Sequence, residues 1–322
     1  MKALVYLGPG MMEYRETGKP EGAVVLRILG SGVCGTDIKT FQKGHHMFAP
    51  PTILGHECIG RVEIAAPGCG VAEGELVAVA PYVECGICER CRKGLGHLCH
   101  GKSYLSGGCF AEYVAMDAGL AKLGLFPIGT PDPVYTLAEP LACVMNGMKK
   151  LTLGAGRKVL VVGSGPMGSL FGALLESMGQ PFAVVEPSAY RRGLIRAWGW
   201  KVISGDEAVE ASFDQIVLTV NRSELVQKYV GAAADGGNVL LFSGFSRSDR
   251  AEVDPYDIHY REVSVTGTFG YARGHFIEAL GVIAREGARF GRLITHRMPL
   301  SRGLDAMSLL QRAEAMKVVL EP

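Results

Sequence analysis

The chain has 322 residues, of which 48% are hydrophobic and 20% are charged, with 33 Lys and Arg against 32 Asp and Glu. This length predicts about two domains, and the apolar fraction excludes a disordered chain. The net charge of +1 argues against a nucleic-acid partner, because neutralising phosphates needs a clustered excess of basic side chains. We find neither an apolar run long enough for a membrane span nor a secretory signal, so we expect a cytoplasmic protein without a membrane partner.

The first 140 residues consist of short apolar runs that Gly and Pro interrupt. The clearest expected strands are residues 23–29, 60–64 and 76–80. Short strands separated by turn signals predict a compact β-rich domain over residues 1–140.

From residue 141 the pattern changes to strands that alternate with helices. Strands are expected at residues 158–162, 182–186, 215–220 and 238–242, and helices at residues 166–178, 190–198 and between the last two strands. This alternation predicts parallel βαβ units, and therefore a doubly wound parallel-sheet α/β domain over residues 141–268. Residues 269–322 are too short for a third domain. We expect them to return to the first domain, with helices at residues 275–286 and 304–315 around an extended segment at residues 292–295.

A glycine-rich hexapeptide lies between the first strand and the first helix of this second domain. The first glycine permits a tight turn, the second lets the backbone approach a pyrophosphate, and the third lets helix and strand pack closely. The start of the helix adds free N–H groups for the phosphates. We therefore expect a dinucleotide at Gly163, Gly165, Pro166, Met167 and Gly168.

Glu186 lies at the end of the next expected strand, 23 residues after Gly163. An acid at this position hydrogen-bonds the adenosine ribose and repels a 2′-phosphate, which favours NAD over NADP. Arg191 is a further candidate cofactor-binding residue. Together with Arg192 it keeps NADP open, because an arginine here can accept a 2′-phosphate, and the alternative for both is a solvated helix face.

All nine cysteines lie in the first half of the chain, and four of them lie within fifteen residues. An odd number confined in this way is typical of metal binding or thiolate chemistry, not of a disulfide framework. Four residues follow the spacing C-x2-C-x2-C-x7-C, namely Cys85, Cys88, Cys91 and Cys99. Four thiolates complete a tetrahedral zinc shell, so this loop predicts a structural zinc site, with an iron–sulfur cluster as the alternative. Gly86 and Gly94 provide turn freedom, and His97 and His100 are interpreted as surface residues.

Two shorter clusters precede this loop, Cys34-Gly35-Thr36-Asp37 and Gly55-His56-Glu57. Together with the cysteine loop and the glycine motif, in this order, they resemble the medium-chain zinc-dependent alcohol dehydrogenase family. The resemblance covers essentially the whole chain. It extends to the segments at residues 107–113, Glu139-Pro140-Leu141, 236–239 and Lys317-Val318-Val319-Leu320.

The resemblance implies a GroES-like β-rich catalytic domain joined to a Rossmann domain. It also implies that Cys34 and His56 are ligands of a catalytic zinc ion. In the polyol and threonine dehydrogenase branch the third protein ligand is the glutamate of the Glu-Pro-Leu segment, here Glu139, for which a surface carboxylate is the alternative. Glu57 can enter or leave the zinc shell, and Asp37 would orient the His56 ring.

In such enzymes the substrate hydroxyl loses its proton at the zinc ion and the carbinol carbon gives a hydride to the nicotinamide. The family likeness implies that Thr36 is the first hydroxyl of the proton relay. Many relatives carry a histidine five residues after the cysteine ligand, where this chain has Lys39. The end of the relay is therefore open between Lys39, His45 or His46, and water.

The expected activity is that of a zinc-dependent oxidoreductase of class EC 1.1.1.-, which transfers a hydride between a secondary alcohol and NAD. The substrate would be a small polyol, amino alcohol or cyclitol-like alcohol or its ketone, with two zinc ions per chain. Relatives are homodimers or homotetramers, and residues 262–266 are a candidate sheet edge for such contacts. The alternatives are a zinc-independent quinone or enoyl reductase, and a non-catalytic nucleotide-binding or redox-sensing protein.

Overall fold

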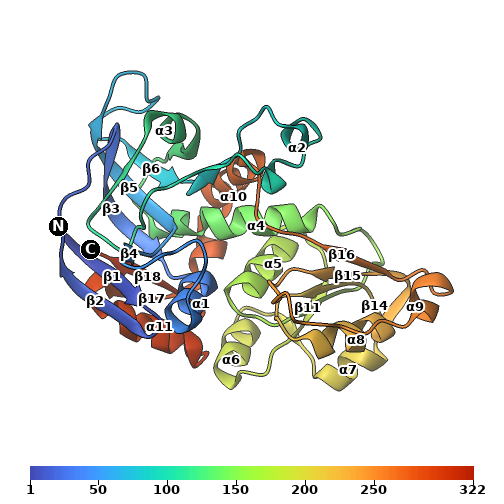
Figure 1. Ribbon diagram of the computed structural model, residues 1–322. Coiled ribbons are helices and arrows are strands. Elements are labelled where there is room, and N and C mark those ends of the chain that lie inside the picture. Colours follow the sequence, from blue (N-terminus) through green and yellow to red (C-terminus); the bar gives the residue numbers. More distant parts are fainter. The chain divides into compact units, whose positions relative to one another are not determined.

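The computed structural model describes all residues of the chain, Met1–Pro322. Its internal contacts form two units, one of Met1–Ala142 with Tyr271–Pro322 and the other of Cys143–Gly270 (Figure 1). The boundaries expected from the sequence were 140/141 and 268/269. No helix has both the length and the apolar character that crossing a membrane requires.

The first unit contains twelve strands, and the second contains six. Those of the first unit are β1 (Lys2–Gly8), β2 (Met11–Glu16), β3 (Val24–Gly32), β4 (Thr52–Ile53), β5 (Glu57–Ala65), β6 (Leu76–Val79), β7 (Tyr82–Val83), β8 (Ser103–Tyr104), β9 (Tyr113–Met116), β10 (Leu125–Pro127), β17 (Ile294–Pro299) and β18 (Lys317–Glu321). The largest sheet has seven strands, in the order β10-β6-β5-β3-β18-β17 with β9 also paired to β3. The early and late segments of the chain thus share one sheet (Figure 1).

Helices of the first unit are short, except for one. They are α1 (Gly35–Lys43), α2 (Glu89–Arg92), α3 (Ala118–Gly124), α10 (Arg273–Gly291) and α11 (Gly303–Gln311), with 3-10 turns at Gly96–Leu98, Pro133–Leu137 and Leu300–Arg302. Helix α4 (Ala138–Met148) begins in this unit and ends in the second.

The core of the first unit follows from the alternation of side chains along its strands. Val24, Leu26 and Ile28 of β3 point into one apolar cluster together with Val77 and Val79 of β6, as the two-residue period of a strand requires. A second cluster joins β1 to α11 and β18. Residues near the C-terminal end of the chain therefore share a core with residues of the first strand.

The C-terminal segment differs in detail from the elements expected for it. Helix α10 does not end at residue 286 but continues to Gly291, across a kink where Glu286 has φ −130° and ψ 30°. Arg292 is helical in conformation, so the extended segment begins at Ile294. Helix α11 ends at Gln311, because Ala313 has a φ of +55°, which a continuing helix does not allow.

The second unit is a six-stranded sheet covered by helices. Its elements are β11 (Val159–Val162), α5 (Pro166–Ser177), β12 (Phe182–Val185), α6 (Ala189–Ala197), β13 (Lys201–Val202), α7 (Gly205–Glu210), β14 (Phe213–Leu218), α8 (Ser223–Ala232), β15 (Ala233–Leu241), α9 (Pro255–His259) and β16 (Ser264–Gly267). The strand order is β13-β12-β11-β14-β15-β16, and every pair is parallel. This order confirms the predicted doubly wound Rossmann sheet.

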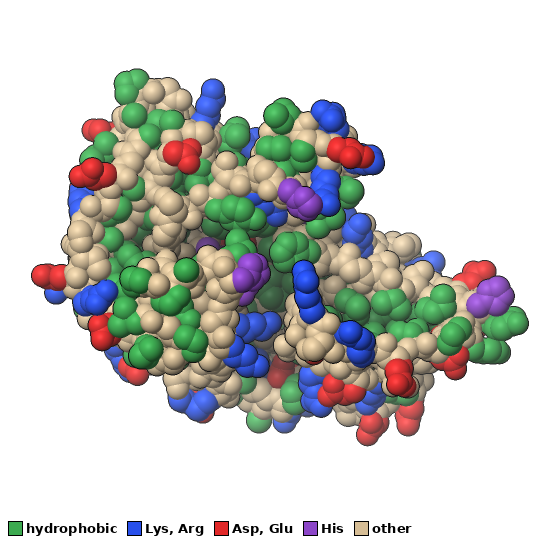
Figure 2. All heavy atoms as spheres, in the orientation of Figure 1, with side chains coloured by type: hydrophobic (Ala, Val, Ile, Leu, Met, Phe, Trp, Pro, Cys, Tyr) green, Lys and Arg blue, Asp and Glu red, His purple; other side chains and the backbone are tan.

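Alternate side chains of the sheet meet helices on its two faces. Leu160 and Val162 of β11 belong to one cluster with Ala208 of α7 and Val226 and Tyr229 of α8. Helix α5 packs against the same strand on the other face (Figure 1). Strand β16 forms one edge of the sheet and overlaps the candidate edge segment, residues 262–266, at residues 264–266. Basic and acidic side chains are both spread over the face drawn in Figure 2.

Candidate metal centres and cofactor site

Cys34 lies in the turn between β3 and α1. It is the N-cap of the helix, where its Sγ accepts the N–H of Thr36 at 3.5 Å and its own N–H donates to Asp37 Oδ2 at 2.9 Å. This reciprocal cap places the thiol at the positive end of the helix dipole.

The segment before β5 brings His56 close to Cys34 and Asp37. Asp37 Oδ1 accepts the N–H of Gly55 at 3.1 Å and lies 3.5 Å from His56 Nδ1. Gly55 has a φ of +92°, and the Phe110 ring occupies the space where a Cβ would be, so glycine is needed here. The buried carboxylate of Asp37 thus connects helix α1 to the start of β5.

Cys34, His56 and Glu57 offer ligand atoms that lie within 4.8 Å of one another. Burial works against a charged imidazole, but the nearby Asp37 and Cys34 raise the pKa of His56 well above its ordinary value. The surroundings of this cluster therefore favour a positive charge, which a metal cation supplies.

Glu57 has one satisfied and one unsatisfied oxygen. Its side chain is fully buried, Oε2 accepts a hydrogen bond from Lys317 Nζ, and Oε1 has no hydrogen-bond partner. A buried carboxylate oxygen without a partner is costly unless a cation meets it. A thiolate, an imidazole and this carboxylate are a donor set that zinc binds, so the residues fit the metal expected from the sequence.

Glu139 lies on the first turn of α4 and is 8% exposed, so the alternative of a surface carboxylate is wrong. Burial raises its pKa to about 7, and the carboxylates of Glu57 and Asp37 add to this, while His56 and Lys317 oppose it. These charges place Glu139 in the electrostatic surroundings of the cluster. It is not among the three residues whose ligand atoms converge.

The residues considered for the proton relay lie on or just after α1. Thr36 is half-buried on the first turn, and Lys39 is exposed. The His45 and His46 rings stack with centroids 4.5 Å apart, and burial together with His46 lowers the pKa of His45. The His45 ring accepts the N–H of Met47 at 3.2 Å, which holds it in the loop after the helix.

The four cysteines of the predicted structural site form a compact tetrad. Their closest Sγ–Sγ distances are 3.5 Å (Cys88–Cys91), 3.5 Å (Cys85–Cys99), 3.7 Å (Cys88–Cys99) and 3.9 Å (Cys85–Cys91). Sulfurs at the corners of a tetrahedron with zinc–sulfur bonds of about 2.3 Å are about 3.8 Å apart. The loop therefore fits a zinc ion with four thiolates and no open position.

The thiols of the tetrad have different proton affinities. Backbone N–H groups of Ile87 and Cys88 lower the pKa of Cys85 to about 6, whereas burial and the adjacent thiols raise that of Cys91 to about 12. Gly86 and Gly94 both have a φ of +74°, which the tight turns of the loop require. His97 is buried, so its interpretation as a surface residue is wrong, whereas His100 is exposed.

The glycine motif of the second unit has the backbone that a pyrophosphate needs. Gly163 has a φ of +88°, and Gly165 is the N-cap of α5 with Pro166 as its first residue. A Cβ on Gly168 would overlap the carbonyl oxygen of Gly163. The turn and the close contact between strand and helix therefore both depend on glycine, and the start of α5 leaves its N–H groups available.

Glu186 is engaged with this motif from the end of β12. It is 6% exposed and accepts the N–H of Ser164 at 2.7 Å, the hydroxyl of Ser164 at 3.1 Å and the N–H of Ser188 at 2.7 Å. Arg191 is half-buried, with a terminal nitrogen 3.5 Å from the position of a Cβ on Gly165. Burial lowers the pKa of this arginine, and Glu186 opposes that effect. A negative and a positive side chain thus flank one glycine turn.

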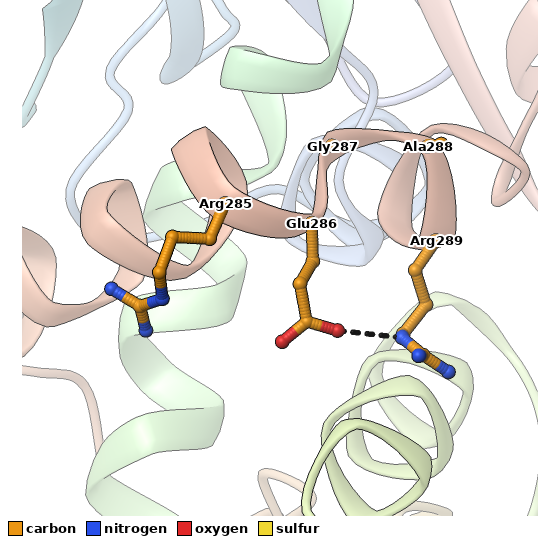
Figure 3. A pocket seen from close by; sticks show the side chains of 5 residues that line it. All are labelled: Arg285, Glu286, Gly287, Ala288 and Arg289. Atoms are coloured by element: carbon orange, nitrogen blue, oxygen red, sulfur yellow. Dashed lines mark hydrogen bonds and ion pairs between the residues drawn. The ribbon is translucent and has the colours of Figure 1, made fainter.

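A pocket of about 250 Å³ lies at the kink of α10 and contains none of the predicted site residues. Arg285, Glu286, Gly287, Ala288 and Arg289 line it, and Arg289 Nε donates to Glu286 Oε2 at 2.7 Å (Figure 3). Glu286 and Arg289 pair with each other, and no predicted site residue lines the pocket, so we assign it no function.

Comparison with known proteins agrees with the two-unit fold and the candidate metal sites described above. The alcohol dehydrogenase GroES-like domain matches residues 20–124. D-altritol 5-dehydrogenase of Agrobacterium fabrum is 33% identical over 301 residues, which cover 88% of each chain. L-threonine 3-dehydrogenase of Pyrococcus furiosus is 30% identical over 261 residues, which cover 78% of this chain and 69% of the relative.

The chain belongs to the medium-chain zinc-dependent alcohol dehydrogenase family. It is an NAD(P)-dependent zinc alcohol or polyol dehydrogenase of class EC 1.1.1.-. A solved zinc-binding dehydrogenase of Sinorhizobium meliloti 1021 with bound NADP has a TM-score of 0.88 and 27% identity, with 100% of this chain and 99% of that chain covered. The two-domain GroES-like and Rossmann architecture implied by the resemblance is thereby confirmed.

Sequence reasoning missed one residue that lies beside the candidate metal cluster of the first unit. Lys317 was noted only as part of a closing motif, yet its ammonium contacts Glu57. A single charged residue at the start of the apolar run Lys317-Val318-Val319-Leu320 is the signal that could have identified it.

Proposed function

We propose that this member of the alcohol dehydrogenase family oxidises a secondary alcohol of the polyol, amino alcohol or cyclitol-like class and uses NAD as hydride acceptor. The proposal rests on the convergence of the ligand atoms of Cys34, His56 and Glu57. One of these atoms, Glu57 Oε1, is buried without a hydrogen-bond partner. The names of the relatives, D-altritol 5-dehydrogenase and L-threonine 3-dehydrogenase, support the class of substrate.

Cys34, His56, Glu57 and Glu139 would hold the catalytic zinc ion, and the four-cysteine loop a structural one. When bound, zinc supplies Lewis acidity that lowers the pKa of an alcohol oxygen, and NAD supplies the hydride acceptor. Asp37 fixes the Nδ1 side of the His56 ring, so that Nε2 is the nitrogen left for a metal.

Thr36 is proposed as the first proton acceptor. Thr36 lies two residues after Cys34 on the first turn of α1, and its Oγ1 would accept the proton that the substrate hydroxyl releases while its own proton passes on toward solvent. Lys39 lies three residues further along, on the same side of the helix, and is exposed. A proton that reaches this side of α1 therefore exchanges with water, and no histidine at that position is required.

NAD is preferred over NADP in this proposal because the negative charge of Glu186 lies directly at the glycine turn. A 2′-phosphate next to that carboxylate would be repelled. Met167, on the first turn of α5 next to Pro166, would contribute its backbone N–H to the phosphates.

We further propose that the chain forms a homodimer or homotetramer through the edge of the Rossmann sheet. Strand β16 is the outer strand, and its Ser264 and Val265 are exposed. An unpaired strand edge can be extended by the same strand of a second copy. Light scattering on the purified protein tests this, and a monomer at all concentrations would exclude it.

The decisive experiment measures zinc content and NADH formation on the same preparation. We expect two zinc ions per chain, in line with the two ligand clusters, and NADH formation with polyols, amino alcohols or cyclitols. Cys34→Ala is the matched control, which should retain one zinc ion and lose activity. One zinc ion in the unaltered chain would favour the quinone or enoyl reductase. Two zinc ions without turnover on a broad alcohol panel would favour a non-catalytic protein.

A further inference from the structure

Lys317 is a buried cation in the last strand of the first unit. It is 1% exposed, and its ammonium donates to Oε2 of the fully buried Glu57. Lysine is almost never fully buried unless it is paired, and a buried ion pair is weak evidence for a role in stability, because desolvation offsets its attraction. The presence of this buried pair next to the apolar run Val318-Val319-Leu320 therefore calls for a role beyond folding.

The sheet brings the two residues together across a glycine. Strand β3 lies between β5 and β18, with Gly32 paired to Glu57 on one side and to Val319 on the other. A Cβ on Gly32 would overlap Glu57 Oε2 and lie 2.9 Å from Lys317 Cε. The ion pair thus passes over Gly32, a position in β3 that has no side chain.

The charges around Lys317 all belong to candidate metal ligands. Burial alone would lower the pKa of its ammonium, but Glu57, Cys34 and Glu139 raise it above the ordinary value. Lys317 also has a fixed backbone, since its carbonyl accepts the hydroxyl of Thr295 at 3.3 Å. The ammonium of Lys317 therefore lies in the electrostatic surroundings of the candidate metal ligands Glu57, Cys34 and Glu139.

We propose that Lys317 is a positioning residue for the catalytic metal. By holding Oε2 of Glu57, it leaves Oε1 as the single oxygen that can meet a metal beside Cys34 and His56. Glu57 then acts as a ligand through one oxygen, and the metal affinity of the site depends on Lys317. The inference rests on the proposed function only in assuming that this cluster takes zinc.

The test is the dissociation constant of zinc at this cluster, measured on the full chain by competition with a chromogenic chelator. Lys317→Met should weaken zinc binding there by roughly 10–100-fold, as the loss of a group that orients a ligand usually does. The zinc ion of the four-cysteine loop should remain. Lys317→Arg, which keeps a charged donor, should restore most of the affinity, and Lys43→Met, at an exposed position on α1, should have no effect. Zinc binding by Lys317→Met that is as tight as in the unaltered chain, or tighter, would overturn the proposal.

A double-mutant cycle with Glu57→Gln separates positioning from a general structural role. If Lys317 acts through Glu57, adding Lys317→Met to Glu57→Gln should change zinc affinity by less than about twofold. An equal loss in both backgrounds would overturn the proposal. The visible spectrum of cobalt at the cluster gives a second readout, which Lys317→Met and Glu57→Gln should alter in the same way. Should Lys317→Met not fold, Lys317→Gln takes its place with the same expected direction.

These outcomes are distinguishable from a failure of the proposed function. An unaltered chain that binds zinc only at the four-cysteine loop would refute the catalytic zinc site itself. An unaltered chain that binds two zinc ions, with Lys317→Met unaffected, would refute only the role of Lys317.

Discussion

Asp37 Oδ1 lies 3.5 Å from Nδ1 of His56, while the other oxygen of the same carboxylate accepts the N–H of Cys34 at 2.9 Å. One buried side chain therefore sets the positions of two metal donors from different elements. Groups that orient ligands in this way affect metal affinity nearly as strongly as the ligands themselves.

Asp37→Ala should accordingly weaken zinc binding at the cluster by roughly 10–100-fold. It should also lower the free energy of unfolding by about 0.5–2 kcal/mol, because helix α1 loses the carboxylate that accepts the backbone N–H of its N-cap, Cys34. Asp117→Ala is a matched control, since Asp117 caps α3 in the same unit by accepting the N–H of Leu120. Urea unfolding should show a similar loss of stability for both variants. Chelator competition should show weaker zinc binding only for Asp37→Ala. Equal zinc affinities in the two variants would contradict the role of Asp37.

Cys99→Ser should remove the zinc ion of the four-cysteine loop and leave the other ion in place. Because metal binding contributes to folding free energy, the loss of stability should exceed the about 1–3 kcal/mol expected for a polar atom newly buried without a partner. Cys69→Ser, at a cysteine that is equally buried but outside both clusters, provides that reference. Zinc analysis by mass spectrometry and thermal unfolding decide the matter, and an unchanged zinc content in Cys99→Ser would exclude the structural site.

Because of Glu139, the free energy of unfolding of the metal-free chain should fall as the pH rises from about 4.5 to about 7. Its pKa is about 7 in the folded state against an ordinary value of 4.5, so the folded state retains a proton that the unfolded state loses between these values. Stability therefore falls through this window, and the full penalty is present above it. Glu139→Gln should gain on the order of 1–3 kcal/mol over the unaltered chain near pH 8 and almost nothing near pH 4. Urea unfolding with a chelator present tests this, and a difference that does not vary with pH would refute it.

The same variant should bind zinc more weakly if Glu139 is a ligand. If Glu139→Gln is more stable without metal but binds zinc more weakly, Glu139 serves function at a cost in stability. Unchanged zinc affinity would exclude it from the ligand set.

Glu186→Gln should shift cofactor preference toward NADP. Removing the charge at the glycine turn lowers the repulsion of a 2′-phosphate, while the amide oxygen can still accept the N–H of Ser164. The ratio of kcat/KM for NADP to that for NAD should rise by about tenfold, which corresponds to about 1.4 kcal/mol. Glu210→Gln, an exposed acid on α7, should leave the ratio unchanged. An unaltered chain that already prefers NADP would show that the interpretation of Glu186 is wrong.

Gly32→Ala should destabilise the first unit and reduce zinc binding at the cluster together. The added methyl group would displace Glu57 and Lys317, and forcing an extra carbon into a packed site costs about 1–3 kcal/mol. Gly18→Ala, at a glycine with open space around it, should change neither property. Thermal unfolding and chelator competition on both variants provide the comparison, and normal zinc binding in Gly32→Ala would contradict the predicted crowding.

The Rossmann unit could be predicted in detail because its signals are local. Strand β11 is a continuous apolar run, the glycine motif follows it at once, and helix α5 begins at the proline of that motif. Each parallel strand is then joined to the next by its own helix, so the topology follows from the order of the elements.

For the first unit only the fold class, a β-rich domain, could be predicted, because its strand pairs join distant parts of the chain. Residues 317–320 were noted only as a closing motif and not as strand β18, and the position of β18 beside β3 has no local signal. Cys34 and His56 were identified by resemblance, whereas the contact between Glu57 and Lys317 spans 260 residues. Long-range packing of this kind leaves no trace in the spacing of residues.

The position of β18 inside the sheet has a consequence for the order of events during synthesis. Ser31 and Gly32 of β3 cannot pair with β18 until the ribosome has made residues 317–321, by which time the whole Rossmann segment has been synthesised. A nascent chain that ends before Lys317 therefore has Cys34, His56 and Glu57 but lacks the cation beside them. The ion pair of Glu57 and Lys317 thus forms only after the whole nucleotide-binding unit has been synthesised and has had time to fold.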